Sequence, residues 1–154
     1  MNPVTSSTHT TAAGTASAAK LTRQNIHPAT LYERRVNGVL LYSPVVKVTH
    51  GSFIFVSGLL SRDVHGTVIG EGDMRAQIRQ VTRNLEWALA SAGASLKDVV
   101  RTCTFTTDID EFFRHPDLRD ELFGPALPTS TTIGVSRLSD PRFLVEVEAF
   151  AMLG

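Results

Sequence analysis

Residues 90–105 read ASAGASLKDVVRTCTF, and this stretch joins the end of a predicted helix to the start of a predicted strand. Gly93 is the residue type that most often ends an α-helix, because it adopts the left-handed conformation without strain. Upstream, apolar residues step by three and four positions, which predicts a helix from an N-cap at Asp73 to about Ala92. These apolar positions are Ile78, Val81, Leu85, Leu89 and Ala92. Downstream, residues 98–109 are rich in Val, Thr and Phe and predict a strand.

The segments further from this junction predict four more strands. Residues 39–48 and 52–60 are β-branched and aromatic runs separated by Thr-His-Gly, which indicates a β-hairpin. Near the C-terminus, residues 130–138 and 143–153 read as two strands joined by Ser-Asp-Pro.

A second helical region lies between the third and fourth strands. Residues 110–124 are helical in character, but Pro116 is costly inside a helix. We therefore expect two pieces, the second with Pro116 in its first turn and Gly124 as its end. The resulting order, ββαβαββ, predicts an α+β fold in which two helices cover one face of a mixed sheet.

Composition limits the classes of function. The chain has 154 residues, 42% of them apolar, and its 15 basic residues balance 15 acidic ones. A neutral chain has no long-range field for phosphate backbones, so we expect no nucleic-acid partner. The helix carries a stripe of Arg75, Arg79 and Arg83, which in this context indicates a solvated face or a subunit contact rather than a phosphate site. A lone cysteine, Cys103, excludes an internal disulfide.

Hydropathy, local composition and motif content give expectations for localisation, domain boundaries and metal binding. No apolar run approaches the ~20 residues that cross a bilayer, so we expect no membrane span and a cytoplasmic protein. Residues 1–24 are rich in Ser, Thr, Ala and Gly, which predicts a disordered tail before a single domain over 25–154. The five histidines are scattered, and no metal-binding motif occurs. We therefore expect no metal site.

Four consecutive hydroxyl side chains, Thr129 to Thr132, open the fourth long strand within the sequence PTSTTIGVSRL. Hydroxyl groups that leave water must find hydrogen-bond partners. The backbone, a neighbouring subunit and a small molecule are all possible partners for them.

The element order, VSG at 56–58, ASAGASLKDVVRTCTF and LVEVEAFA at 144–151 together resemble the Rid family, the YjgF-like reactive-intermediate deaminases. The resemblance covers residues 39–153. It implies a chorismate-mutase-like fold assembled as a homotrimer with clefts between subunits. It also implies hydrolysis of reactive enamines and imines to keto acids and ammonia, without a cofactor.

The same resemblance implies roles for several residues. Family deaminases bind the substrate carboxylate with an arginine in a Pro-Ala-Arg triplet, and here Ser130 of Pro-Thr-Ser occupies that position. Thr132 stands where many relatives carry cysteine. Ser57 and Gly58 match a pair that lines the cleft, and Glu146 matches a glutamate that positions the attacking water. These residues are expected to line the cleft, although Ser57 and Gly58 could be a plain strand end and Glu146 a structural ion-pair partner.

Two further residues are candidates to replace missing family groups. The family's cleft tyrosine falls on Pro44, and Tyr42 lies two residues away. Arg119 precedes Leu122 and Phe123 by three and four positions, which predicts an arginine on the apolar side of its helix. Such an arginine needs a partner, either a substrate anion or, alternatively, Glu146 or Glu148. Packing of its stem beneath an exposed head is a further alternative.

The sequence therefore favours a homotrimeric Rid-like hydrolase acting on an enamine or imine, with Glu146, Ser130 and Arg119 as catalytic candidates. Ser57, Gly58, Thr132 and Tyr42 are the expected substrate-binding residues. The missing family arginine leaves a non-catalytic trimer that binds a small metabolite or a partner protein as the alternative. An endoribonuclease or translation inhibitor is a third, less favoured hypothesis.

Overall fold

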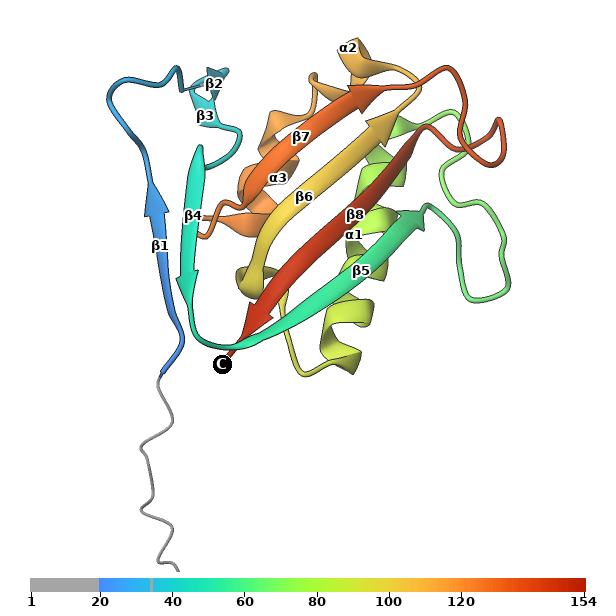
Figure 1. The fold of residues 1–154 in the computed structure, drawn as a ribbon. Helices are drawn as coiled ribbons and strands as arrows, with labels where there is room; N and C mark the ends of the chain where they lie inside the picture. The colour runs from blue at the N-terminus through green and yellow to red at the C-terminus, as the bar shows by residue number, and fades with distance from the viewer. Residues whose placement is uncertain (1–19, 34) are drawn as a thin grey trace, which may run out of the picture.

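The computed structural model describes residues 20–33 and 35–154, and its centre is a four-stranded mixed sheet (Figure 1). The strand order is β5-β8-β6-β7, in which β6 and β7 are parallel and the other pairs are antiparallel. The strands are β5 (Ser52–Leu60), β6 (Val99–Thr106), β7 (Thr129–Gly134) and β8 (Val145–Leu153). The predicted mixed sheet is confirmed.

The helices all lie on one face of this sheet (Figure 1). They are α1 (Met74–Ser91), α2 (Ile109–Phe112) and α3 (Pro116–Phe123), and a short 3-10 turn, η1 (Leu96–Asp98), precedes β6. Asp73 caps α1 by accepting a hydrogen bond from the Ala76 backbone N–H at 3.0 Å, and Gly93 follows the helix with φ +76°. Pro116 begins α3, and Gly124 ends it. The expected helices and the break between α2 and α3 are confirmed.

The hydrophobic core lies between α1 and the sheet. Leu85 and Leu89 of α1 are buried against Val56 of β5 and Ala149 and Ala151 of β8. The stripe of arginines lies on another side of α1, where Arg75 pairs with Asp117 and Arg79 with Glu121. Two of the three arginines therefore link α1 to α3 within the chain.

The predicted hairpin between residues 39–48 and 52–60 is not formed. The first run is divided into β3 (Val39–Leu40), which pairs with β2 (Arg35–Val36), and β4 (Val45–Thr49), which pairs with β1 (Thr22–Ile26). The Ser43 backbone N–H donates to the Pro128 carbonyl at 3.1 Å, and its hydroxyl donates to the Leu127 carbonyl at 2.8 Å. These bonds dock the run against the start of β7 instead of against β5.

Strand β1 also changes the expected boundary of the folded domain. Residues 22–24 form its first part, although composition placed them in a disordered tail. The Arg23 guanidinium donates to the carbonyls of Lys97 and Ala126, so the strand is joined to the segments before β6 and β7. Residues 1–19 of the predicted tail lie outside the described residues.

Candidate functional site

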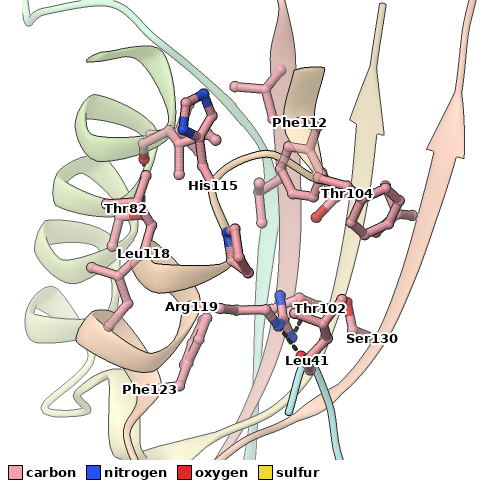
Figure 2. Close-up of a pocket in the computed structure, with 18 of the residues that line it drawn as sticks. Leu41, Thr82, Thr102, Thr104, Phe112, His115, Leu118, Arg119, Phe123 and Ser130 are labelled. Atoms are coloured by element: carbon pink, nitrogen blue, oxygen red, sulfur yellow. Dashed lines mark hydrogen bonds between the residues drawn. The ribbon is translucent and has the colours of Figure 1, made fainter. Parts of the chain in front are cut away.

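A pocket of about 260 Å³ lies between the helical layer and the sheet. Its floor is formed by β6, β7 and β8, one wall by α1, and its roof by α2 and α3 (Figure 2). Because parallel strands need a crossover connection, the chain from β6 to β7 must pass over this face of the sheet. That crossover carries α2 and α3, so the topology itself builds the roof of the pocket.

A ladder of hydroxyl groups faces the pocket from the two parallel strands. Thr102 and Thr104 of β6 pair in register with Ser130 and Thr132 of β7, and all four side chains line the cavity. The Thr102 hydroxyl donates to the Ser130 hydroxyl oxygen at 3.1 Å. Since the Ser130 oxygen is the acceptor in this bond, its own hydrogen is available to a ligand.

The other two hydroxyl side chains of the run 129–132 have different surroundings. Thr129 donates to the Val100 carbonyl at 3.0 Å, and Thr131 accepts from Arg101 at 3.4 Å on the other face of the sheet. Backbone and side-chain partners within the chain therefore satisfy Thr129 and Thr131, whereas Ser130 and Thr132 face the cavity.

Arg119 of α3 points into the pocket beside Thr102 and Ser130 (Figure 2). Its Nε donates to the Leu41 carbonyl, its Nη2 contacts the Thr102 hydroxyl at 3.4 Å, and its guanidinium lies 5.3 Å from the centre of the Phe123 ring. Burial lowers the pKa of Arg119 to about 10. The side chain therefore carries a desolvated positive charge at neutral pH.

The partner of this charge is not a carboxylate of the described chain. The alternative ion pairs with Glu146 or Glu148 are not formed, and the residues that line the pocket include no Asp or Glu. Within residues 20–33 and 35–154, the Nη1 group of Arg119 has no hydrogen-bond acceptor. This nitrogen and the Ser130 hydroxyl are thus suited to bind an anionic group together.

The structure divides the predicted site residues between the two faces of the sheet. Ser130, Thr132, Arg119 and Tyr42 all line the pocket. Glu146 faces away from it, because successive side chains of a strand alternate and its neighbours in β8 point into the cavity. Ser57 and Gly58 are not among the lining residues. A single chain therefore does not bring all seven residues into one cleft.

Glu146 has a crowded position on the opposite face. Its carboxylate lies over Gly58, at a point where a Cβ atom would collide with Oε1, so the glycine leaves room for it. Ser57 and Gly58 fall where the register between β5 and β8 shifts, between Val56 and Leu59. Burial raises the pKa of Glu146, nearby Glu148 raises it further, and Arg62 offsets part of the effect.

Sequence reasoning did not identify Thr102, Thr104 or His115 as pocket residues. The two threonines alternate along a predicted strand, but only the parallel register places them beside Ser130 and Thr132. The His115 ring lines the pocket, while its Nε2 lies 3.3 Å from Glu111 Oε1 and its Nδ1 lies 3.5 Å from Arg75 Nη1. Both ring nitrogens therefore have protein partners.

The described residues show neither a metal-binding cluster nor a membrane-spanning helix. Among residues 20–33 and 35–154, no cluster of three or more His, Cys, Asp or Glu side chains could hold a metal ion. None of the helices in these residues has the length and apolar character required to span a membrane.

Comparison with known proteins connects this geometry to a family. A family model described as Endoribonuclease L-PSP matches residues 33–153. A RutC family protein of Pyrococcus abyssi is 37% identical over 110 residues, which cover 71% of this chain and 84% of the relative. The 3-aminoacrylate deaminase RutC of Acinetobacter baylyi is 31% identical over 110 residues, with 71% and 85% of the two chains covered.

A solved structure agrees with these matches. A Rid-family protein of unknown function from Yersinia pestis superposes with a TM-score of 0.73 at 29% identity, covering 85% of this chain and 98% of the other. The fold is therefore that of the YjgF-like proteins, as the sequence motifs predicted. Since the family model also spans most of the chain, the protein belongs to the RutC/Rid family.

Proposed function

We propose that this protein hydrolyses a reactive 2-imino acid, or the enamine that tautomerises to it, to a keto acid and ammonia. One observation carries the proposal: the partly buried guanidinium of Arg119 lies near the Ser130 hydroxyl and has no carboxylate partner in the described chain. Arg119 takes over the carboxylate-binding role of the family arginine that Ser130 replaces. The named activity of one relative, 3-aminoacrylate deaminase, supports the same class of substrate.

The protein needs mainly to position the substrate and the attacking water. Arg119 holds the carboxylate, and the hydroxyl groups of Ser130 and Thr132 lie beside the C=N group. A water molecule attacks the iminium carbon and loses a proton, which gives a carbinolamine. This intermediate collapses to the keto acid and expels ammonia. Because imines react with water unaided, holding the substrate and directing the water accounts for the acceleration.

The water needs a base, and the lining residues of the described chain contain no carboxylate. We expect the protein to be a homotrimer with its clefts between subunits. Glu146 lies on the sheet face that neighbouring subunits would cover, so we expect it to enter an adjoining cleft and orient the water there. Gly58 lies next to the Glu146 carboxylate, and Gly58 and the adjacent Ser57 are expected to form part of the same cleft wall.

The test is to generate imines in situ from several amino acids and to follow release of keto acid and ammonia. We expect Arg119→Met to lower kcat/KM by about a hundredfold, because methionine cannot donate a charge-assisted hydrogen bond to the substrate carboxylate. Arg79→Met is the matched control, because Arg79 is an arginine on α1 that pairs with Glu121 outside the pocket. An unchanged background rate with every imine would refute the hydrolase proposal.

The absence of a carboxylate from the lining also favours a second candidate function, a trimer that binds a metabolite without transforming it. Keto acids would then raise Tm by mass action while no imine is consumed. The endoribonuclease activity in the description of the family model has less support, since the chain has no net charge and Arg119 is the sole Lys or Arg among the lining residues. RNA cleavage that disappears in Arg119→Met would reverse that judgement.

A further inference from the structure

The pocket has two chemically different ends (Figure 2). At one end, Arg119, Ser130 and Thr102 present a cation and hydroxyl groups. Most of the remaining lining residues are apolar and come from α1, α2, α3 and β8, and the polar ones among them are Tyr42, Thr82, Thr104, His115 and Thr132. The apolar residues include Ile78, Val81, Leu85, Phe112, Val145 and Val147. A ligand that fits both ends must therefore combine an anionic head with an apolar body.

The volume sets the size of that apolar body. An apolar protein cavity of about 150 Å³ binds one benzene molecule. The pocket, at about 260 Å³, has room for such a ring together with a short carboxylate-bearing chain. A substrate of two or three carbons would leave the apolar end empty, or filled by water with few hydrogen-bond partners.

Two of the polar residues that line the pocket away from Arg119 have partners already, and Thr104 and Thr132 add only neutral hydroxyl groups. The Thr82 hydroxyl donates to the Ile78 carbonyl at 2.9 Å. The two His115 ring nitrogens lie beside Glu111 and Arg75. Among the described lining residues, no charged side chain other than Arg119 is therefore left to receive a second charged substituent, whose burial without a partner would be costly.

We infer that the substrate side chain is bulky and apolar, an aromatic ring or a long branched chain, and not the methyl or methylene group of a three-carbon imine. The inference rests on the proposed function, because it describes the side chain of the same 2-imino acid. The head binds to Arg119 and Ser130, and the ring or branched chain fills the space between α1 and Val145 and Val147 of β8.

Calorimetric titration of the full-length protein tests this preference without turnover. Phenylpyruvate and pyruvate are stable keto-acid counterparts of a bulky and a small imine. We expect phenylpyruvate to bind about tenfold more tightly than pyruvate or better, since only its ring buries apolar area. Phenylacetone, which has the ring but no carboxylate, should bind more weakly than phenylpyruvate. Equal affinity for phenylpyruvate and pyruvate would overturn the inference.

Variants at the apolar end provide a second test. Ile78→Phe fills this end from α1 and should weaken phenylpyruvate binding about tenfold while changing pyruvate binding less than about threefold. An equal loss for both ligands would contradict the assigned position of the ring. If Ile78→Phe does not fold, Phe112→Ala decides: it enlarges the same end and should shift preference from phenylpyruvate toward indole-3-pyruvate. No shift in that preference would count against the inference.

The outcomes separate this inference from the proposed function. Selective binding of phenylpyruvate without acceleration of any imine would support the side-chain preference and refute the hydrolase. Hydrolysis of the alanine-derived imine at least as fast as the phenylalanine-derived imine, with no binding preference, would support the hydrolase and refute the preference.

Discussion

Arg119 is the residue on which the candidate site depends, and its environment explains why. Partial burial removes water from the guanidinium, yet the described chain offers it a carbonyl oxygen, a hydroxyl and an aromatic ring instead of a carboxylate. An unpaired desolvated charge is destabilising on its own. A bound anion would supply the missing partner. The desolvated charge destabilises the ligand-free protein, and relief of that destabilisation on binding increases the affinity for an anion.

The first prediction concerns removal and relocation of this charge. Arg119→Met should lower phenylpyruvate affinity about tenfold or more, while the free energy of unfolding changes by less than about 1 kcal/mol. The small change is expected because relief of desolvation offsets the hydrogen bond lost at Leu41. Adding Ser130→Arg should restore affinity to within about threefold, since Ser130 is joined to Arg119 through Thr102. Calorimetric titration and urea unfolding measure the two effects, and a double variant no better than Arg119→Met would show that position 130 cannot supply the cation.

The second prediction concerns Glu146, whose pKa is raised by burial and by Glu148. A raised carboxyl pKa means that the folded state disfavours the ionised form, so stability is lost as pH rises through the ordinary value of 4.5 and the higher folded value. Glu146→Gln should therefore raise Tm at pH 7, and the difference should vanish below about pH 4. Glu86→Gln, on the exposed side of α1, is the control. A benefit that persists unchanged at acid pH would rule out this electrostatic cause.

At the scale of elements, Gln77 joins α1 to the loop that precedes this helix and to the segment that precedes β8. Its side chain is fully buried, and its Nε2 donates to the carbonyls of Gly70 at 3.1 Å and Arg142 at 2.8 Å. Its Oε1 accepts from the Leu144 backbone N–H at 2.8 Å. One amide group therefore satisfies three backbone groups and fixes where β8 begins beneath α1.

The third prediction follows from that role. Gln77→Leu keeps the volume of the side chain but leaves three buried backbone groups without partners, and it should lower the free energy of unfolding by about 2–4 kcal/mol. Gln80→Leu is the matched control, because the Gln80 side-chain amide donates to Asn84 within the same helix. It should cost less than about 1 kcal/mol. Similar urea midpoints for the two variants would show that the buried network contributes little.

Local signals allowed the helices to be predicted, whereas pairings between distant segments could not be. The apolar spacing of α1, the Asp73 cap and Pro116 act within a few residues, and each has its predicted place. The partner of β4 is β1, and the contacts that hold this pair in place join Arg23 and Asn25 to carbonyls about a hundred positions away. The polar sequence TRQNI of β1 has no pattern that predicts a strand.

The same distinction applies to the candidate site. The apolar spacing around Arg119 could be read from the chain, and the resemblance added Ser130, Thr132 and Tyr42; the structure places all four in the pocket. The same resemblance grouped Glu146 with them, but strand alternation puts Glu146 on the opposite face from Val145 and Val147. Whether a neighbouring subunit reunites these groups depends on assembly, which a single sequence does not determine.

At the scale of the molecule, the sheet face opposite the helices carries a cluster of aromatic side chains on β5 and β8. Phe53 and Phe55 of β5 are 69% and 72% exposed. Their rings lie 6.0 Å apart, and Phe55 also makes an edge contact with Phe150 of β8 at 5.3 Å. A contiguous exposed aromatic cluster is typical of a surface that another protein covers. This face supports the proposed homotrimer.

The fourth prediction tests that assembly. Light scattering after gel filtration should give a trimer for the wild-type protein and a smaller species for Phe55→Glu, because a buried unpaired charge would be placed in the interface. Trp87→Glu is the control, since Trp87 is 59% exposed on α1, on the other side of the sheet. A wild-type monomer, or an unchanged trimer in Phe55→Glu, would contradict the proposed interface.

The crossover between β6 and β7 has an additional consequence for how this protein can diversify. Residues 107–128 carry α2 and α3 and supply Arg119 and much of the apolar lining of the pocket, while the other lining residues come from α1, the sheet and the segment with Leu41 and Tyr42. One uninterrupted stretch of sequence thus behaves as an exchangeable cassette. Exchange of that stretch between homologues would change ligand choice in a single event, provided that its partners in the rest of the chain, such as Arg75 and Arg79, were matched to it.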